Sequence, residues 1–245
     1  MAAGTDFSWA RRAMYAAFVF ALAAMLLYPG GTLRDPTTTG YSFSRNFISD
    51  LGNTVSFGGQ PNNPSAVLAM ASAATVVAAI LLATIGFVRL LSAARAARTL
   101  ARAAGVGGAV ACLAVVGVAL APGNRSLLLH VLFGQTASGA IGLSALLLAL
   151  ASLRDGRFTK GVPAAWLALA IVVAALFLVR WGGPGITTDE GLVFHVVKQK
   201  IVAVVILLIF IYQTRQADRV ARATDDRRVA GSPNAATPGA GNSCP

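Results

Sequence analysis

An all-α membrane protein, built as a bundle of six transmembrane helices, is predicted by three properties of this 245-residue sequence. Hydrophobic residues make up 56% of the chain and charged residues only 12%, whereas soluble domains carry about 25% charged residues. The mean hydropathy is +0.69. The apolar residues fall into six runs, each near the roughly 20 residues that a helix needs to cross a bilayer. These properties exclude a soluble enzyme.

Short connections join the six runs, apart from one longer loop between the first and the second. Because the bilayer core offers no water to backbone polar groups, each run has to satisfy them internally, and we expect a helix in each. Together they form a predicted membrane domain over residues 1–212. The predicted spans are residues 13–28, 64–91, 103–121, 127–153, 162–181 and 192–212.

The basic residues indicate the orientation of the bundle. Of the 20 Lys and Arg residues, 14 lie before the first run, after the sixth, or in the second-to-third and fourth-to-fifth connections. Four lie on the opposite side, and Lys198 and Lys200 fall within the sixth run. By the positive-inside rule, we expect a multi-pass protein of the cell membrane with both termini in the cytoplasm. Topology thus accounts for the net charge of +11, which does not indicate nucleic acid as a partner.

Residues 213–245 form a tail of different composition. Its first part is basic, with Arg215, Arg219 and Arg222 on one helical face, where they could contact anionic headgroups. Enforcing topology is the favoured role for these arginines. From Asp225 onwards the tail is rich in Asp, Arg, Ala, Gly and Pro and is predicted to be disordered.

The long outer loop carries a helical pattern in its middle. Phe43, Phe47 and Leu51 repeat at i, i+4 and i+8, which predicts a short amphipathic helix at the outer interface. A serine on either side of Phe43 can cap its start, and the glycine after Leu51 can end it. Asn46 and Asp50 are i, i+4 neighbours on its polar side. The motif residues of this segment are Ser42, Asn46, Ser49, Asp50 and Gly52.

The string YSFSRNFISDLG at residues 41–52 resembles the signature of an uncharacterised membrane protein family, the domain of unknown function 998 family. NNPSA at 62–66, LHVLF at 129–133 and VVKQKI at 196–201 extend this resemblance, which covers about residues 13–212. The resemblance implies a six-helix bundle. It brings no established activity, cofactor or catalytic residue to this chain.

Ionisable groups inside apolar runs are costly, and each is a candidate for a functional role. The chain has two histidines, His130 and His195, each about one turn into a helix start on the outer side. With Asp50 they could hold Zn²⁺, because imidazole and carboxylate groups are among its preferred ligands and a fourth position would activate water. A metal-dependent hydrolase acting on a lipid at the outer leaflet would follow, with Ser44 or Ser49 nearby.

Three other interpretations are open for the same polar residues. The two histidines could ligate a haem between their helices. Basic side chains could bind a lipid phosphate at the outer interface without catalysis; the candidates are Arg45, Arg125, Lys198 and Lys200. In a purely structural interpretation, Asp50 would pair with Lys198, Lys200 or Arg45, and the histidines would bind backbone carbonyl groups at helix ends.

No motif in the sequence establishes an enzymatic activity. GxSxG, HExxH and the phosphate-binding glycine loop are all absent from it. We therefore favour a non-enzymatic protein that interacts with membrane lipids or has a structural or assembly role at the outer leaflet. The alternative is the hydrolase, with zinc as its cofactor.

Overall fold

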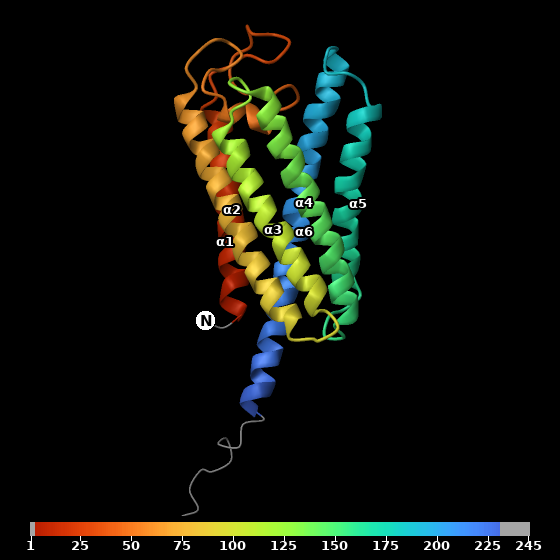
Figure 1. Ribbon diagram of the computed structural model, residues 1–245. Helices are drawn as coiled ribbons and strands as arrows, with labels where there is room; N and C mark the ends of the chain where they lie inside the picture. The colour runs from red at the N-terminus through yellow and green to blue at the C-terminus, as the bar shows by residue number, and fades with distance from the viewer. Residues whose placement is uncertain (1–2, 231–245) are drawn as a thin grey trace, which may run out of the picture.

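The computed structural model describes residues 3–230, apart from the side chains of residues 3–6, 180–182 and 228–230. This part of the chain is helical throughout its regular structure, as the sequence predicts, and forms an elongated bundle (Figure 1). Each of the six α-helices is long and apolar enough to cross a membrane. They are α1 (Ala3–Leu26), α2 (Asn63–Ser92), α3 (Arg98–Leu120), α4 (Leu127–Arg154), α5 (Gly161–Gly182) and α6 (Asp189–Ala230).

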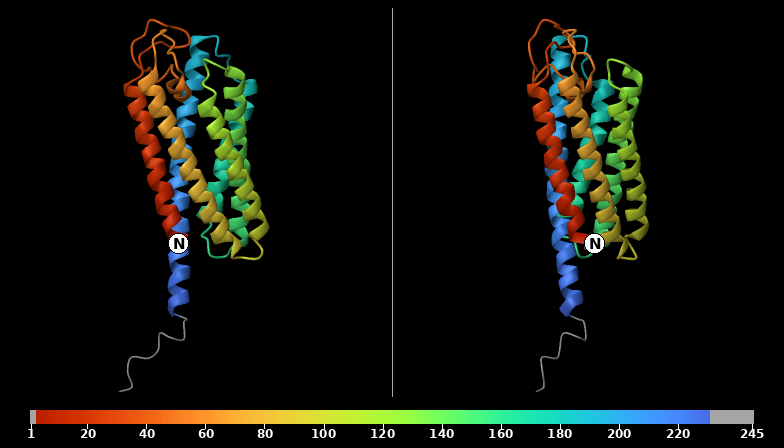
Figure 2. Two further views of the ribbon diagram at one scale, coloured as in Figure 1. Left: turned by 60° about the vertical axis from the view of Figure 1, so that its left-hand side comes forward. Right: turned by 90° about the vertical axis from the view of Figure 1, so that its left-hand side faces the viewer.

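The helices run up and down in chain order. Each packs against the next one, and α6 returns to pack against α1, so that the six helices close into a ring. Both described chain ends therefore lie at the same end of the bundle, which we call the terminal end (Figures 1 and 2). The opposite end, which we call the loop end, carries the connections at residues 27–62, 121–126 and 183–188.

Two helices are longer at the terminal end than the sequence predicts. The first helix begins at Ala3 rather than near residue 13, and α6 continues to Ala230 although disorder was predicted from Asp225. The extensions stabilise each other, since Arg11 of α1 donates to Asp218 of α6 across 2.5 Å. The rest of the predicted tail, residues 231–245, lies outside the described residues.

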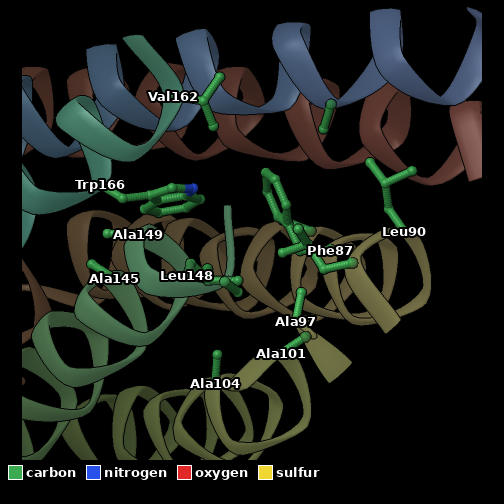
Figure 3. Packing of buried hydrophobic residues seen from close by; sticks show 14 of the residues in the cluster. Phe87, Leu90, Ala97, Ala101, Ala104, Ala145, Leu148, Ala149, Val162 and Trp166 are labelled. Carbon is green, nitrogen blue, oxygen red and sulfur yellow. The ribbon is translucent and has the colours of Figure 1, made fainter. Parts of the chain in front are cut away.

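The largest apolar cluster lies in the terminal half of the bundle (Figure 3). Phe7, Phe87 and Trp166 come from three helices and stack edge to face, with ring centroids 5.0 Å and 5.2 Å apart. This geometry suits the charge distribution of aromatic rings. Gly86 lies against Phe7, where an added Cβ atom would stand 2.8 Å from the ring. The small residue is thus what allows the ring of α1 to approach α2.

The predicted short helix of the loop between α1 and α2 is present, but it is shorter than expected. It is a 3₁₀ helix, η1 (Ile48–Gly52), and the segment before it forms a turn. Phe43 is 64% exposed whereas Leu51 is 1% exposed, so they do not share a buried helical face. The cause is local: the Asn46 side chain accepts a hydrogen bond from the Ser42 amide, and such contacts compete with helix formation.

Candidate functional site

The loop of residues 27–62 folds into an ordered structure that we call the loop cap. Its backbone bonds to itself, with the Gly31 amide donating to the Thr38 carbonyl at 2.7 Å and the Gly40 amide to that of Pro29 at 3.1 Å. Gly31 has a φ of +84°, a conformation that glycine adopts without a steric penalty. Leu51 of η1 packs on Ala24 of α1 and on Tyr28, two residues after the end of that helix. The loop cap is therefore fixed to the bundle by its own small apolar cluster.

Asn46 is the polar centre of the loop cap. It is fully buried, and its side-chain oxygen accepts the Ser42 amide at 2.8 Å. Its side-chain nitrogen donates to the Gly31 carbonyl at 2.9 Å and to Asp50 Oδ2 at 3.4 Å. Its own carbonyl accepts the hydroxyl of Tyr41 at 2.9 Å. One side chain thus joins three separate parts of the loop cap.

Asp50 lies beside this centre and is 6% exposed. Its carboxylate accepts the backbone amide of Phe47 at 2.7 Å, which closes the first turn of η1. Burial raises the pKa of Asp50 to about 6, although the hydrogen bonds from Phe47 and Asn46 and the positive charge of Lys200 oppose this shift. Asp50 thus holds the first turn of η1 from a buried position.

Lys200 reaches the loop cap from α6. Its side chain is buried, and its ammonium donates to the Asn46 carbonyl at 2.6 Å. The rings of Tyr41 and Phe43 lie over it, with centroids 5.3 Å and 5.0 Å from Nζ. The contact with Asp50 that the structural interpretation expected is therefore a longer-range attraction, and the direct bond goes to a carbonyl group.

Further contacts fasten the loop cap to α6 and to the connection before it. The Ile48 amide donates to Gln199 Oε1 at 2.8 Å. The guanidinium of Arg45 donates two hydrogen bonds, of 3.1 Å and 2.8 Å, to the carboxylate of Asp189 at the start of α6. The guanidinium of Arg34 donates to the Thr187 carbonyl. The sequence does not predict these contacts with α6 and with the connection before it, because they pair residues about 150 positions apart.

The connection between α3 and α4 makes a second attachment. Asn124 donates its side-chain amide to Thr54 Oγ1 at 2.9 Å, and its backbone amide donates to Asn53 Oδ1 at 3.2 Å. Asn62, which precedes α2, donates its side-chain amide to the Asn53 carbonyl and so connects Asn53 to the start of α2. The neighbouring Arg125, a predicted headgroup residue, is exposed. The loop cap thus contacts both sides of the ring of helices.

The two histidines each bind a backbone carbonyl group. His130 Nδ1 lies 2.8 Å from the carbonyl oxygen of Ala121, and His195 Nε2 lies 2.8 Å from that of Pro184. Asp50 does not lie in a group with either histidine: among the described side chains, no three His, Cys, Asp or Glu residues gather as a metal site would require. The predicted zinc ligands are therefore not brought together.

The remaining motif residues have backbone or surface roles in this structure. The Ser42 carbonyl accepts the Asn46 amide at 2.8 Å. Ser44 and Ser49 are partly exposed, in the turn and in η1 respectively. Gly52 is the last residue of η1 rather than a left-handed residue after a helix.

A hollowed, apolar surface lies on the face of α6 that points away from the loop cap, and we call it the α6 groove. It is an open depression of about 390 Å³. A second hollow of about 440 Å³, between the ends of α5 and α6, adjoins it at Phe194. Lys198 is the one charged residue among the lining residues of both hollows. The α6 groove is lined by Val193, Phe194, Val197, Lys198, Ile201 and Val202.

The four predicted headgroup residues do not form one cluster. Lys198 faces the α6 groove, whereas Lys200 faces the loop cap, because two positions along a helix correspond to about 200° of rotation. Arg45 is held by Asp189, and Arg125 stands at the turn between α3 and α4. Among the four, only Lys198 lines a hollow of the surface.

No model of a known protein family matches this chain, and neither a curated protein nor a solved structure shows significant similarity to it. The resemblance of residues 41–52 to the domain of unknown function 998 family stays a prediction.

Proposed function

We propose that this protein is a lipid-binding, non-enzymatic protein of the cell membrane, with both termini in the cytoplasm and its loop cap at the outer leaflet. The orientation is supported by the basic residues, of which 14 belong to the terminal end and four to the loop end, while two lie within α6. As part of the same proposal, the chain is a member of the domain of unknown function 998 family.

The α6 groove is the observation that carries the lipid-binding role. Its walls are apolar, and Phe194 and Ile201 on it are 41% and 58% exposed. Exposed apolar surface on a transmembrane helix faces acyl chains, and a hollow in that surface can retain one of them. A cationic side chain at the same place favours contact with a headgroup.

The absence of catalysis is supported by what the candidate catalytic groups do. Both histidines and Asp50 are engaged in contacts that shape helix ends and the loop cap. A hydrolase would need these groups to converge on one reacting bond. Their contacts serve the fold at three separate places instead.

Purified protein tests this proposal. Lipids extracted from the protein in mild detergent would be identified and compared with those of the whole membrane. In parallel, the protein would be incubated with the same lipids, with and without added zinc, and the products analysed by mass spectrometry. We expect retained intact lipid and no hydrolysis products. Zinc-dependent hydrolysis that is lost in His130→Ala would replace the proposal with the hydrolase.

Orientation is tested separately. Fusion of a fluorescent protein that matures only in the cytoplasm to the chain after Pro245 should give a fluorescent membrane fraction. Fusion of a phosphatase that is active only outside the cytoplasm should give no activity at the same position. The reverse pattern would place the loop cap on the cytoplasmic side.

A further inference from the structure

Lys198 is directed towards the loop end of the bundle. In an α-helix each Cα–Cβ bond tilts towards the helix N-terminus, and α6 begins at the loop end with Asp189. Lys198 lies about 14 Å along the helix from that start. Its flexible side chain can therefore bring the ammonium from the acyl-chain level towards the headgroup level.

His195 holds the ammonium of Lys198 in this position. Its Nε2 lies 2.8 Å from the Pro184 carbonyl oxygen, which can only accept a hydrogen bond, so Nε2 carries the hydrogen. The other ring nitrogen, Nδ1, then has a lone pair and accepts from Lys198 Nζ at 2.9 Å. The ring of Phe194 adds a cation–π contact, with its centroid 5.6 Å from Nζ.

The groove beside this ammonium suits a hydrocarbon chain. It is about 390 Å³ in volume, and all of its lining residues other than Lys198 are apolar. A free phosphate ion would gain nothing from such walls. A molecule that is anionic at one end and apolar along the rest satisfies both features, and in a bilayer that molecule is an anionic phospholipid.

We propose that the α6 groove is a binding site for an anionic phospholipid, with the headgroup phosphate on Lys198 and one acyl chain along Val197 and Ile201. This inference rests on the proposed lipid-binding function and adds the class of lipid and the residue that selects it. An ammonium has three donors, so the bond to His195 does not by itself prevent a contact with a phosphate oxygen. His195 acts as a positioning residue, since it orients the ammonium and does not itself contact the lipid.

Lys200 does not take part in this selection. Its ammonium is buried against the Asn46 carbonyl and two aromatic rings on the opposite side of α6. Arg125 offers a matched control, because it carries the same charge at the same end of the bundle and lies outside both hollows.

The test is a competition between two phospholipids with identical acyl chains, phosphatidylglycerol and phosphatidylcholine, added to delipidated protein and counted by native mass spectrometry. The parent protein should retain phosphatidylglycerol about fivefold better, because one lysine near a headgroup contributes about 1 kcal/mol. Lys198→Gln should remove this preference, and Arg125→Gln should keep it. Val197→Trp should lower retention of both lipids, because the indole fills the groove.

The outcomes separate the inference from the function on which it rests. Lipid that is retained without preference, or a preference that Lys198→Gln leaves intact, would overturn the anionic site but not lipid binding. Equal losses from Lys198→Gln and Arg125→Gln would indicate general charge attraction and would also overturn the site. Retention that Val197→Trp leaves unchanged would place the lipid outside the groove. No retained lipid in any well-folded variant would overturn the proposed function itself.

Discussion

The ammonium of Lys200 lies 2.6 Å from the carbonyl oxygen of Asn46, a residue 154 positions earlier in the chain. This contact brings the last helix onto the first loop. The same asparagine uses its side chain to hold Ser42 and Gly31. Asn46 therefore contributes both to the order of the loop cap, through its side chain, and to the attachment of the loop cap to α6, through its backbone carbonyl.

Asn46→Ala should loosen the loop cap. The substitution removes the partners of the Ser42 amide and the Gly31 carbonyl, and a buried group left without its partner costs roughly 1–3 kcal/mol. We expect a lower thermal unfolding midpoint in detergent and faster proteolysis within residues 27–62.

Ser49→Ala is the matched control for this prediction. Ser49 lies in the same motif, is partly exposed, and its hydroxyl makes no hydrogen bond within the described residues. It should behave as the parent protein does. Equal protease resistance of Asn46→Ala and the parent would mean that the other contacts of the loop cap hold it without the Asn46 side chain.

Asp50 should make the stability of the protein depend on pH. Its pKa is about 6 in the folded protein because of burial, against about 3.9 in an unfolded chain. The folded state therefore binds more protons at Asp50 between these values, and the contribution of Asp50 to stability is greatest below about pH 4 and is lost as the pH rises through about 6. The difference is on the order of 2–3 kcal/mol.

Asp50→Asn should flatten this profile, because the amide carries no charge at any of these pH values and its oxygen can still accept the Phe47 amide. Unfolding midpoints measured between pH 4.5 and 7.5 test the prediction. A profile that keeps its slope in Asp50→Asn would assign the pH dependence to another group.

The helices and their order could be predicted from the sequence because each depends on a continuous run of residues. An apolar stretch such as residues 64–91 identifies its own helix, and α2 spans Asn63–Ser92. The ends of α1 and α6 are harder to predict, because the extended parts of these helices are joined by Arg11 and Asp218, which are 207 positions apart. Only the packing of the two helices brings such residues together.

The site was only partly predictable for the same reason. The sequence singled out Asn46 and Asp50 correctly as neighbours, because an i, i+4 relationship is local. It offered no signal that Gln199 would bind the Ile48 amide. Lys198 and Lys200 are close in sequence, which predicts that they act together, but the rotation of the helix places them on opposite faces.

Gly86→Ala should destabilise the terminal half of the bundle. An added Cβ would stand 2.8 Å from the Phe7 ring, which is fully buried and stacked on Phe87. Overpacking of this kind costs roughly 1–3 kcal/mol, and we expect a lower thermal unfolding midpoint. Gly134→Ala is the control, since the same atom in α4 meets nothing within 4 Å and alanine favours the helix. A midpoint that falls equally in both variants would show that the Phe7 contact is not the cause.

Removing one partner of the ion pair between Arg11 and Asp218 should destabilise the protein, whereas replacing both partners by apolar residues should not. Their side chains are only 16% and 7% exposed, and Arg11 Nη1 and Asp218 Oδ1 have no hydrogen-bond partner among the described residues. Asp218→Leu leaves the arginine buried without its counter-charge, which costs roughly 3–5 kcal/mol. Arg11→Met/Asp218→Leu removes both charges together with their unmet hydrogen bonds, and we expect its unfolding midpoint to return to that of the parent or above it.

Midpoints of the parent, both single variants and the double variant form a double-mutant cycle. A double variant as unstable as the sum of the two single variants would show that the charges contribute independently, and the pair would then not be what joins α1 to α6.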